Sequence, residues 1–116
     1  MDFGAWDGRT WADLETADAT RLQRWMADWT TERVPGGESF ADLIARMRSL
    51  IDALPRHTDD STLIVAHAGS IRAAAVVLLD LPPKRAFSLA VDHLHLTSFS
   101  LSAASATLTR WNASAF

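Results

Sequence analysis

The chain has 116 residues, which is enough for one hydrophobic core and one domain. A formal net charge of −3 gives no electrostatic reason to expect nucleic acid or an anionic membrane surface as a partner. The absence of cysteine excludes disulfides, thiolate metal sites and thiol catalysis. No apolar run approaches the roughly 20 residues that span a bilayer, and the first residues do not resemble a signal peptide, so we expect a cytoplasmic protein.

The N-terminal third is predicted to be a loop followed by two helices. Residues 1–9 are rich in glycine and tryptophan and indicate a loop. Thr10 is placed to cap a short helix over residues 11–16, and a second helical stretch follows over residues 19–31. The run Pro35-Gly36-Gly37 then breaks the chain.

The clearest helix begins at Phe40. Apolar residues recur there at spacings of three and four, up to Leu54, with charged residues between them. Ser39 lies where an N-cap belongs, and Asp42 follows three residues later, as in a capping box. Pro55 ends the helix.

The second half of the chain is predicted to alternate strand and helix. Residues 62–66 form a short, apolar run, typical of a strand buried on both faces of an α/β sheet. A helix is expected over residues 70–79, and two strands over residues 95–101 and 106–112, joined by a hairpin turn at residues 102–105. This order predicts an α/β protein with a three-layer α/β/α sandwich.

The junction between residues 62–66 and the following helix is the most informative place for function. His67 follows the predicted strand at its carboxyl end, where ligands bind in open α/β sheets. The first amides of the helix, from Ala68 to Ser70, have no acceptors within the helix and suit a phosphate. Protonated His67 would add positive charge beside the same anion. Spacing alone leaves a second interpretation open, in which His67 only ends the strand and bonds a loop carbonyl.

Three stretches resemble the histidine phosphatase superfamily, in the order in which the family has them. Residues 2–11 resemble its "E-x-x-F-G-x-W-E-G" segment, residues 35–46 its "P-G-G-E-S-x-x-D-x-x-x-R" segment, and residues 65–72 its "V-S-H-G-G-x-I-R" segment. The tail over residues 87–112 is similar to the end of the α-ribazole phosphatase (CobC) subgroup. The resemblance implies a phosphoglycerate mutase-like fold.

The resemblance also implies a phosphomonoesterase that uses two histidines and neither metal nor other cofactor. The first histidine, in an R-H-G motif, becomes phosphorylated, while His67 matches the second, which contacts the phosphoryl oxygens. Ala68, Gly69 and Ser70 are then expected to bind phosphate. Arg9 and His93 are further candidates for contact with an anionic substrate, a small phosphate monoester or inorganic phosphate.

The sequence departs from the family pattern in one way that matters most. It contains no R-H-G, and the glutamate that serves as proton donor in the family would lie just before Met1. We therefore expect residues 1–116 to be a single, partial domain that lacks the first strand and first helix and is weak or inactive as an enzyme. Ala66 and Ala68 also replace the usual serine and glycine. The alternative is a non-catalytic module that binds phosphate or forms oligomers.

Three further expectations concern other residues. His93 and His95 form an H-x-H that could hold a metal on one strand face, although two solvated histidines are the simpler interpretation. The five tryptophans could form a ligand surface or supply core area. Loss of a neighbouring strand would expose the edge of the strand over residues 62–66, which predicts a homo-oligomer.

Overall fold

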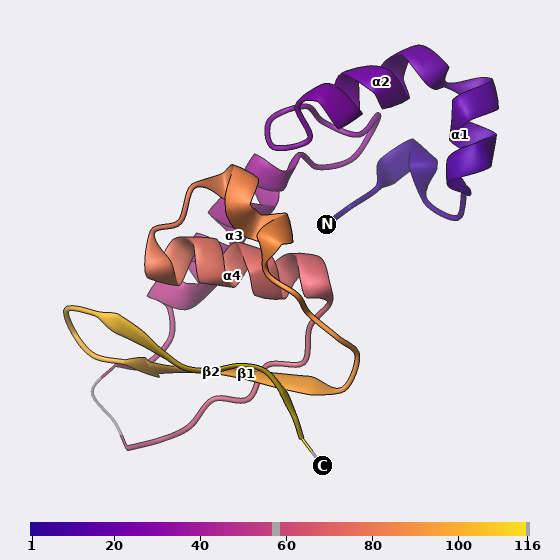
Figure 1. The fold of residues 1–116 in the computed structure, drawn as a ribbon. Coiled ribbons are helices and arrows are strands. Elements are labelled where there is room, and N and C mark those ends of the chain that lie inside the picture. Colours follow the sequence, from indigo (N-terminus) through magenta and orange to yellow (C-terminus); the bar gives the residue numbers. More distant parts are fainter. Residues whose placement is uncertain (57–58, 116) are drawn as a thin grey trace. The chain divides into compact units, whose positions relative to one another are not determined.

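The computed structural model describes residues 1–56 and 59–115, which fall into two compact units, Met1–Leu43 and Ile44–Phe116. Helices predominate in the first unit, and the second contains helices and an antiparallel hairpin (Figure 1). The chain is therefore a mixed α and β protein. Within its described part, no helix combines the length and the apolar character that a membrane crossing requires.

Helix α1 (Trp11–Ala17) begins where the sequence predicts. The Thr10 side chain accepts a hydrogen bond from the Asp13 amide, and the Asp13 carboxylate accepts one from the Thr10 amide, which completes a capping box. Helix α2 (Ala19–Ala27) follows after Asp18. It ends four residues before the predicted limit, because residues 29–31 form a turn in which Asp28 accepts from the hydroxyls of both following threonines.

The core of the first unit is formed by side chains from the loop, both helices and the segment that follows. Its buried members are Trp6, Leu14, Leu22 and Val34. Trp6 lies in the short 3₁₀ helix η1 (Gly4–Trp6), and its indole Nε1 donates to the Asp18 carboxylate at 3.0 Å. The N-terminal loop is thereby tied to the start of α2.

Two loops of the first unit, residues 2–5 and 35–38, cross so closely that their backbones are hydrogen-bonded to each other. The Ala5 amide donates to the Pro35 carbonyl at 2.8 Å, and the Glu38 amide donates to the Asp2 carbonyl at 2.9 Å. A Cβ at Gly4 would lie 2.4 Å from the Pro35 oxygen, and φ at Gly4 is +46°. A Cβ at Gly37 would lie 2.4 Å from the Asp2 oxygen. Only glycine permits so close an approach.

Helix α3 (Phe40–Asp52) begins where the sequence predicts and ends two residues before Leu54. The Ser39 hydroxyl accepts from the Asp42 amide at 3.1 Å, and the Ser39 amide donates to the Asp42 carboxylate at 2.9 Å. Arg33 Nη2 also donates to this carboxylate, at 2.7 Å. The bonds from the Ser39 backbone and side chain, followed by the Arg33 charge, hold the pKa of Asp42 below its ordinary value.

In the second unit, helix α4 (Ala68–Leu79) packs against the 3₁₀ helix η2 (Pro83–Ser88) and the hairpin. Arg72 Nε donates to the Leu89 carbonyl at 2.9 Å, and its guanidinium lies 5.1 Å from the centre of the Phe87 ring. Arg72 therefore fastens η2 to α4.

Strands β1 (His95–Leu101) and β2 (Ala106–Ser114) form an antiparallel pair. The turn between them closes where predicted, since the Ser102 amide donates to the Ser105 carbonyl at 2.8 Å. Strand β2 continues two residues beyond its predicted end. In the described part of the chain these two strands are the whole sheet.

The prediction of a buried strand over residues 62–66 is wrong. These residues form a coil that leads into α4 (Figure 1), and Leu63, Ile64 and Val65 are 80%, 49% and 94% exposed. A strand of this kind needs hydrogen-bonded neighbours and a layer on each face. Within the described residues, 1–56 and 59–115, no backbone hydrogen bond joins this segment to another part of the chain. The strands β1 and β2 pair only with each other.

The loop crossing predicts different costs for two glycine substitutions. We expect Gly4→Ala to lower the free energy of unfolding by about 2–4 kcal/mol, because the new methyl group meets backbone atoms in a left-handed conformation. Gly8 is the control, since its φ is +72° but a Cβ there would meet nothing within 4 Å. Gly8→Ala should cost only about 1 kcal/mol. Urea denaturation followed by circular dichroism measures both, and equal losses would contradict the assigned crossing.

The caps of α1 and α3 predict a loss of stability in acid. The pKa of Asp42 is lowered in the folded chain, as is that of Asp13 by its bonds to Thr10, so both carboxylates stabilise the fold above their unfolded pKa. This contribution disappears as the pH falls from about 4 through the folded pKa. The difference in unfolding free energy between wild type and Asp42→Asn should therefore shrink between pH 5 and pH 2, roughly the interval in which an aspartate titrates. A constant difference would rule out the cap as its source.

Candidate functional site

His67 occupies the N-cap position of α4. Its backbone is extended, with φ −82° and ψ 157°, as is usual for an N-cap residue. Its carbonyl accepts from the Ile71 amide at 3.1 Å, while its side chain forms no capping bond and is exposed to solvent. The imidazole is therefore available at the mouth of the helix. Both interpretations placed His67 at the end of a buried strand, and in the described residues no strand precedes it.

Helix α4 begins two residues earlier than predicted, at Ala68. Ala68, Gly69 and Ser70 are therefore its first three residues, and all three are half-buried. Their amides precede the first i to i−4 bond of the helix, which the Ile71 amide makes. The positive end of the helix dipole lies at the same place. His67 and these three amides are therefore consecutive at the start of α4.

The replacement of the usual glycine by Ala68 causes no backbone strain. The residues other than glycine with positive φ in the described chain are Asp80, Leu94 and Asn112. Ala68 has helical geometry, so its methyl group does not oppose the start of α4.

His93 lies in the turn that precedes β1. Its side chain is exposed, and its carbonyl lies 2.9 Å from His95 Nδ1. Leu94, between them, has φ +59°, so the two histidines are not alternate residues of one strand face. The geometry expected for an H-x-H metal site is absent. In residues 1–56 and 59–115 no three histidine, aspartate or glutamate side chains gather as metal ligands would.

The segment just before this turn is fastened to the end of β2. The Asp92 amide donates to Asn112 Oδ1, and Asn112 Nδ2 donates back to the Asp92 carboxylate, both at 2.8 Å. Trp111 Nε1 donates to the Ala90 carbonyl at 2.7 Å. Asp92 therefore belongs to the contacts that fasten the segment before β1 to the end of β2.

Arg9 belongs to the first unit and lies in a cleft of about 230 Å³. The cleft is lined by Phe3, Trp6, Asp7, Gly8, Arg9, Trp11 and Leu14. Trp6 is buried, whereas Trp11 is 54% exposed, so the tryptophans divide between core and surface. No periodic pattern in the sequence indicates that these residues share a cleft, because a loop gathers most of them.

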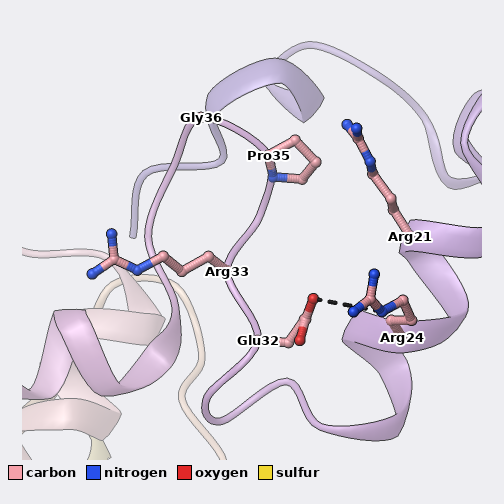
Figure 2. Close-up of a pocket in the computed structure, with 6 residues that line it drawn as sticks. All are labelled: Arg21, Arg24, Glu32, Arg33, Pro35 and Gly36. Atoms are coloured by element: carbon pink, nitrogen blue, oxygen red, sulfur yellow. Dashed lines mark ion pairs between the residues drawn. The ribbon is translucent and has the colours of Figure 1, made fainter.

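A second depression, of about 370 Å³, lies between α2 and the loop before α3 (Figure 2). Its lining residues are Arg21, Arg24, Glu32, Arg33, Pro35 and Gly36. Each arginine has an acidic partner: Arg24 Nε lies 4.0 Å from Glu32, Arg21 Nε 3.9 Å from Asp18, and Arg33 bonds Asp42. Of the three acidic partners, only Glu32 lines the depression, so its lining consists of three arginines and one carboxylate.

Comparison with known proteins shows the family. The model of the histidine phosphatase superfamily (branch 1) matches residues 1–114. The chain therefore belongs to this superfamily, and the resemblance carried by the three sequence motifs is confirmed.

Two solved structures and one curated relative show how much of the family's length the chain spans. The α-ribazole phosphatase of Shigella flexneri is 27% identical, with a TM-score of 0.87, and the match covers 100% of this chain and 59% of that one. A mycobacterial glucosyl-3-phosphoglycerate phosphatase, solved with inorganic phosphate, is 30% identical, with a TM-score of 0.71, over 97% of this chain and 60% of that one. A bifunctional protein of Mycobacterium tuberculosis is 38% identical over 101 residues, which cover 86% of this chain and 27% of that protein.

The family match and the likeness to the α-ribazole phosphatase structure together confirm the predicted phosphoglycerate mutase-like fold.

Proposed function

We propose that this chain carries a phosphate-binding part of a phosphomonoester hydrolase, with His67 and the first amides of α4 as the phosphate ligands. The observation that carries the proposal is the exposed imidazole at the N-cap of a 12-residue helix. Amide hydrogens at a helix N-terminus favour an anion, and a protonated imidazole beside them adds a second source of positive charge. Arg9 and His93 stay predictions as further ligands, and the proposal does not depend on them.

The relatives support this substrate class. Two of them are named as phosphatases of small phosphate monoesters, and one was solved with inorganic phosphate. We propose an α-ribazole phosphatase-like activity for a complete domain that contains residues 1–116. In it, His67 donates hydrogen bonds to phosphoryl oxygens and stabilises the charge that develops on them during phosphoryl transfer.

By itself the 116-residue chain should be a very weak catalyst. It holds no R-H-G sequence, so it lacks the histidine that the family resemblance assigns as the nucleophile. Loss of a nucleophile typically lowers kcat by several powers of ten, because only binding of the transition state remains. Phosphate binding and turnover are therefore separable properties of this chain.

We expect inorganic phosphate to shift the amide NMR signals of Ala68, Gly69 and Ser70 in the purified chain. His67→Ala should reduce these shifts, because it removes a cationic ligand and leaves only the helix amides. His95→Ala is the matched control, since His95 is also exposed but begins β1. Shifts that do not change in His67→Ala would contradict the proposed role of His67.

We expect p-nitrophenyl phosphate hydrolysis by the same chain to remain at background. Turnover above background that His67→Ala abolishes would show that the chain does not need the histidine of an R-H-G motif. That result would overturn the proposed division between binding and chemistry.

A second candidate function is self-association, and the exposed segment over residues 62–66 favours it. Leu63 and Val65 are among the most exposed large apolar side chains in the described chain. Their segment is neither helix nor strand and makes no backbone hydrogen bond to the other described residues. A strand of another copy could pair with it and cover the apolar side chains.

Analytical ultracentrifugation should therefore detect a concentration-dependent dimer or larger species. Val65→Lys should shift the equilibrium toward the monomer at least about tenfold, since it places a charge in the new interface. Leu50→Lys is the control, because Leu50 is also exposed but lies on α3. A monomer at high concentration, or an equal effect of both variants, would exclude pairing through this segment.

A further inference from the structure

The aromatic cleft of the first unit has the form of a small binding site. It is lined by the seven residues from Phe3 to Leu14 named above and has a volume of about 230 Å³. This is below the range of roughly 300–1,000 Å³ that drug-sized ligands occupy, so it suits a single ring. Gly8 forms part of its wall, and a Cβ there would meet nothing within 4 Å.

Trp11 lines this cleft. Its ring stacks on Trp25, with ring centres 5.9 Å apart and planes inclined by 28°. Trp25 in turn meets the edge of Trp6 at 6.0 Å, and Trp6 is buried and bonded to Asp18. The indole of Trp11 is therefore held by two further rings, although it is 54% exposed. A ligand that stacks on Trp11 therefore loses little binding free energy to the ordering of this side chain.

The polar groups of the cleft are one carboxylate, on Asp7, and one guanidinium, on Arg9. Both side chains are exposed, and in the described residues neither has an ion-pair partner within 4 Å. A carboxylate only accepts hydrogen bonds and a guanidinium only donates them. The pair is neutral overall, so it does not favour a ligand with net charge.

We propose that this cleft binds a neutral saccharide ring. One face of a pyranose presents C–H groups that pack on an indole, and its hydroxyls both donate and accept hydrogen bonds. Asp7 would accept from one hydroxyl, and Arg9 would donate to another. A planar aromatic ligand without hydroxyls would stack on Trp11 but leave both charged groups unpaired, which costs free energy. For an anion, attraction by Arg9 would be offset by repulsion from Asp7.

This inference goes beyond the proposed phosphatase function. The cleft is formed by the first unit alone, and binding there is measured without phosphate and without turnover. Failure of the phosphate-binding test at His67 would leave it unaffected, and the reverse also holds.

The experiment is a titration of the ¹⁵N-labelled chain with methyl β-D-glucopyranoside, followed through the five indole N–H signals. We expect the signals of Trp11 and Trp25 to shift, with a Kd in the millimolar range, and the signal of Trp111 to stay unchanged. Trp11→Ala should remove the effect. Asp7→Asn should weaken binding about fivefold, because an amide is a poorer acceptor than a carboxylate.

Two ligand controls make the test specific. Sorbitol has the hydroxyls of a sugar but no ring face, and naphthalene-2-sulfonate has a planar ring and a negative charge but no hydroxyls. The proposal fails if sorbitol shifts the Trp11 signal as the glucoside does, or if only the sulfonate shifts it. It also fails if the glucoside shifts no signal, or shifts that of Trp111 equally.

Discussion

The close crossing of two loops is the constraint on which the first unit depends. Backbone atoms near Gly4 and Gly37 approach so closely that neither position has room for a Cβ. The crossing is followed directly by Ser39, which caps α3. The "F-G" and "P-G-G" elements of the family motifs thus have a structural reason, which is the need for two glycines where two loops meet.

The second unit depends on the start of α4. His67 has an extended backbone and is the last residue before the helix, so the first amides of the helix follow it directly. Arg72 then binds the helix to the segment after η2 through the Leu89 carbonyl, while the Asp92–Asn112 pair closes the base of the hairpin. These contacts join residues 17 and 20 positions apart, and neither involves the coil over residues 62–66.

That coil shows what a sheet requires beyond a suitable sequence. Residues 62–66 have the apolar, β-branched composition of a central strand, and the Shigella relative matches the chain over only 59% of its own length. A strand is stabilised by neighbours on both sides, whereas a helix makes its backbone bonds within itself. The same residues therefore remain exposed here, with their apolar side chains available to a partner.

Much of the local structure was determined by the sequence alone. Thr10 and Ser39 start helices because their hydroxyls and the aspartates three residues later satisfy free amides, and Ser102–Ser105 close a hairpin for a similar local reason. The position of His67 beside a helix N-terminus was predictable in the same way. Only the tertiary structure decided that residues 62–66 are unpaired, and that Trp11, Asp7 and Arg9 share a cleft. A hydrogen-bonded cap joins residues within four positions of each other, so it can be recognised in the sequence. Strand pairing joins segments far apart in the chain, and the cleft is formed largely by a loop whose residues follow no periodic pattern.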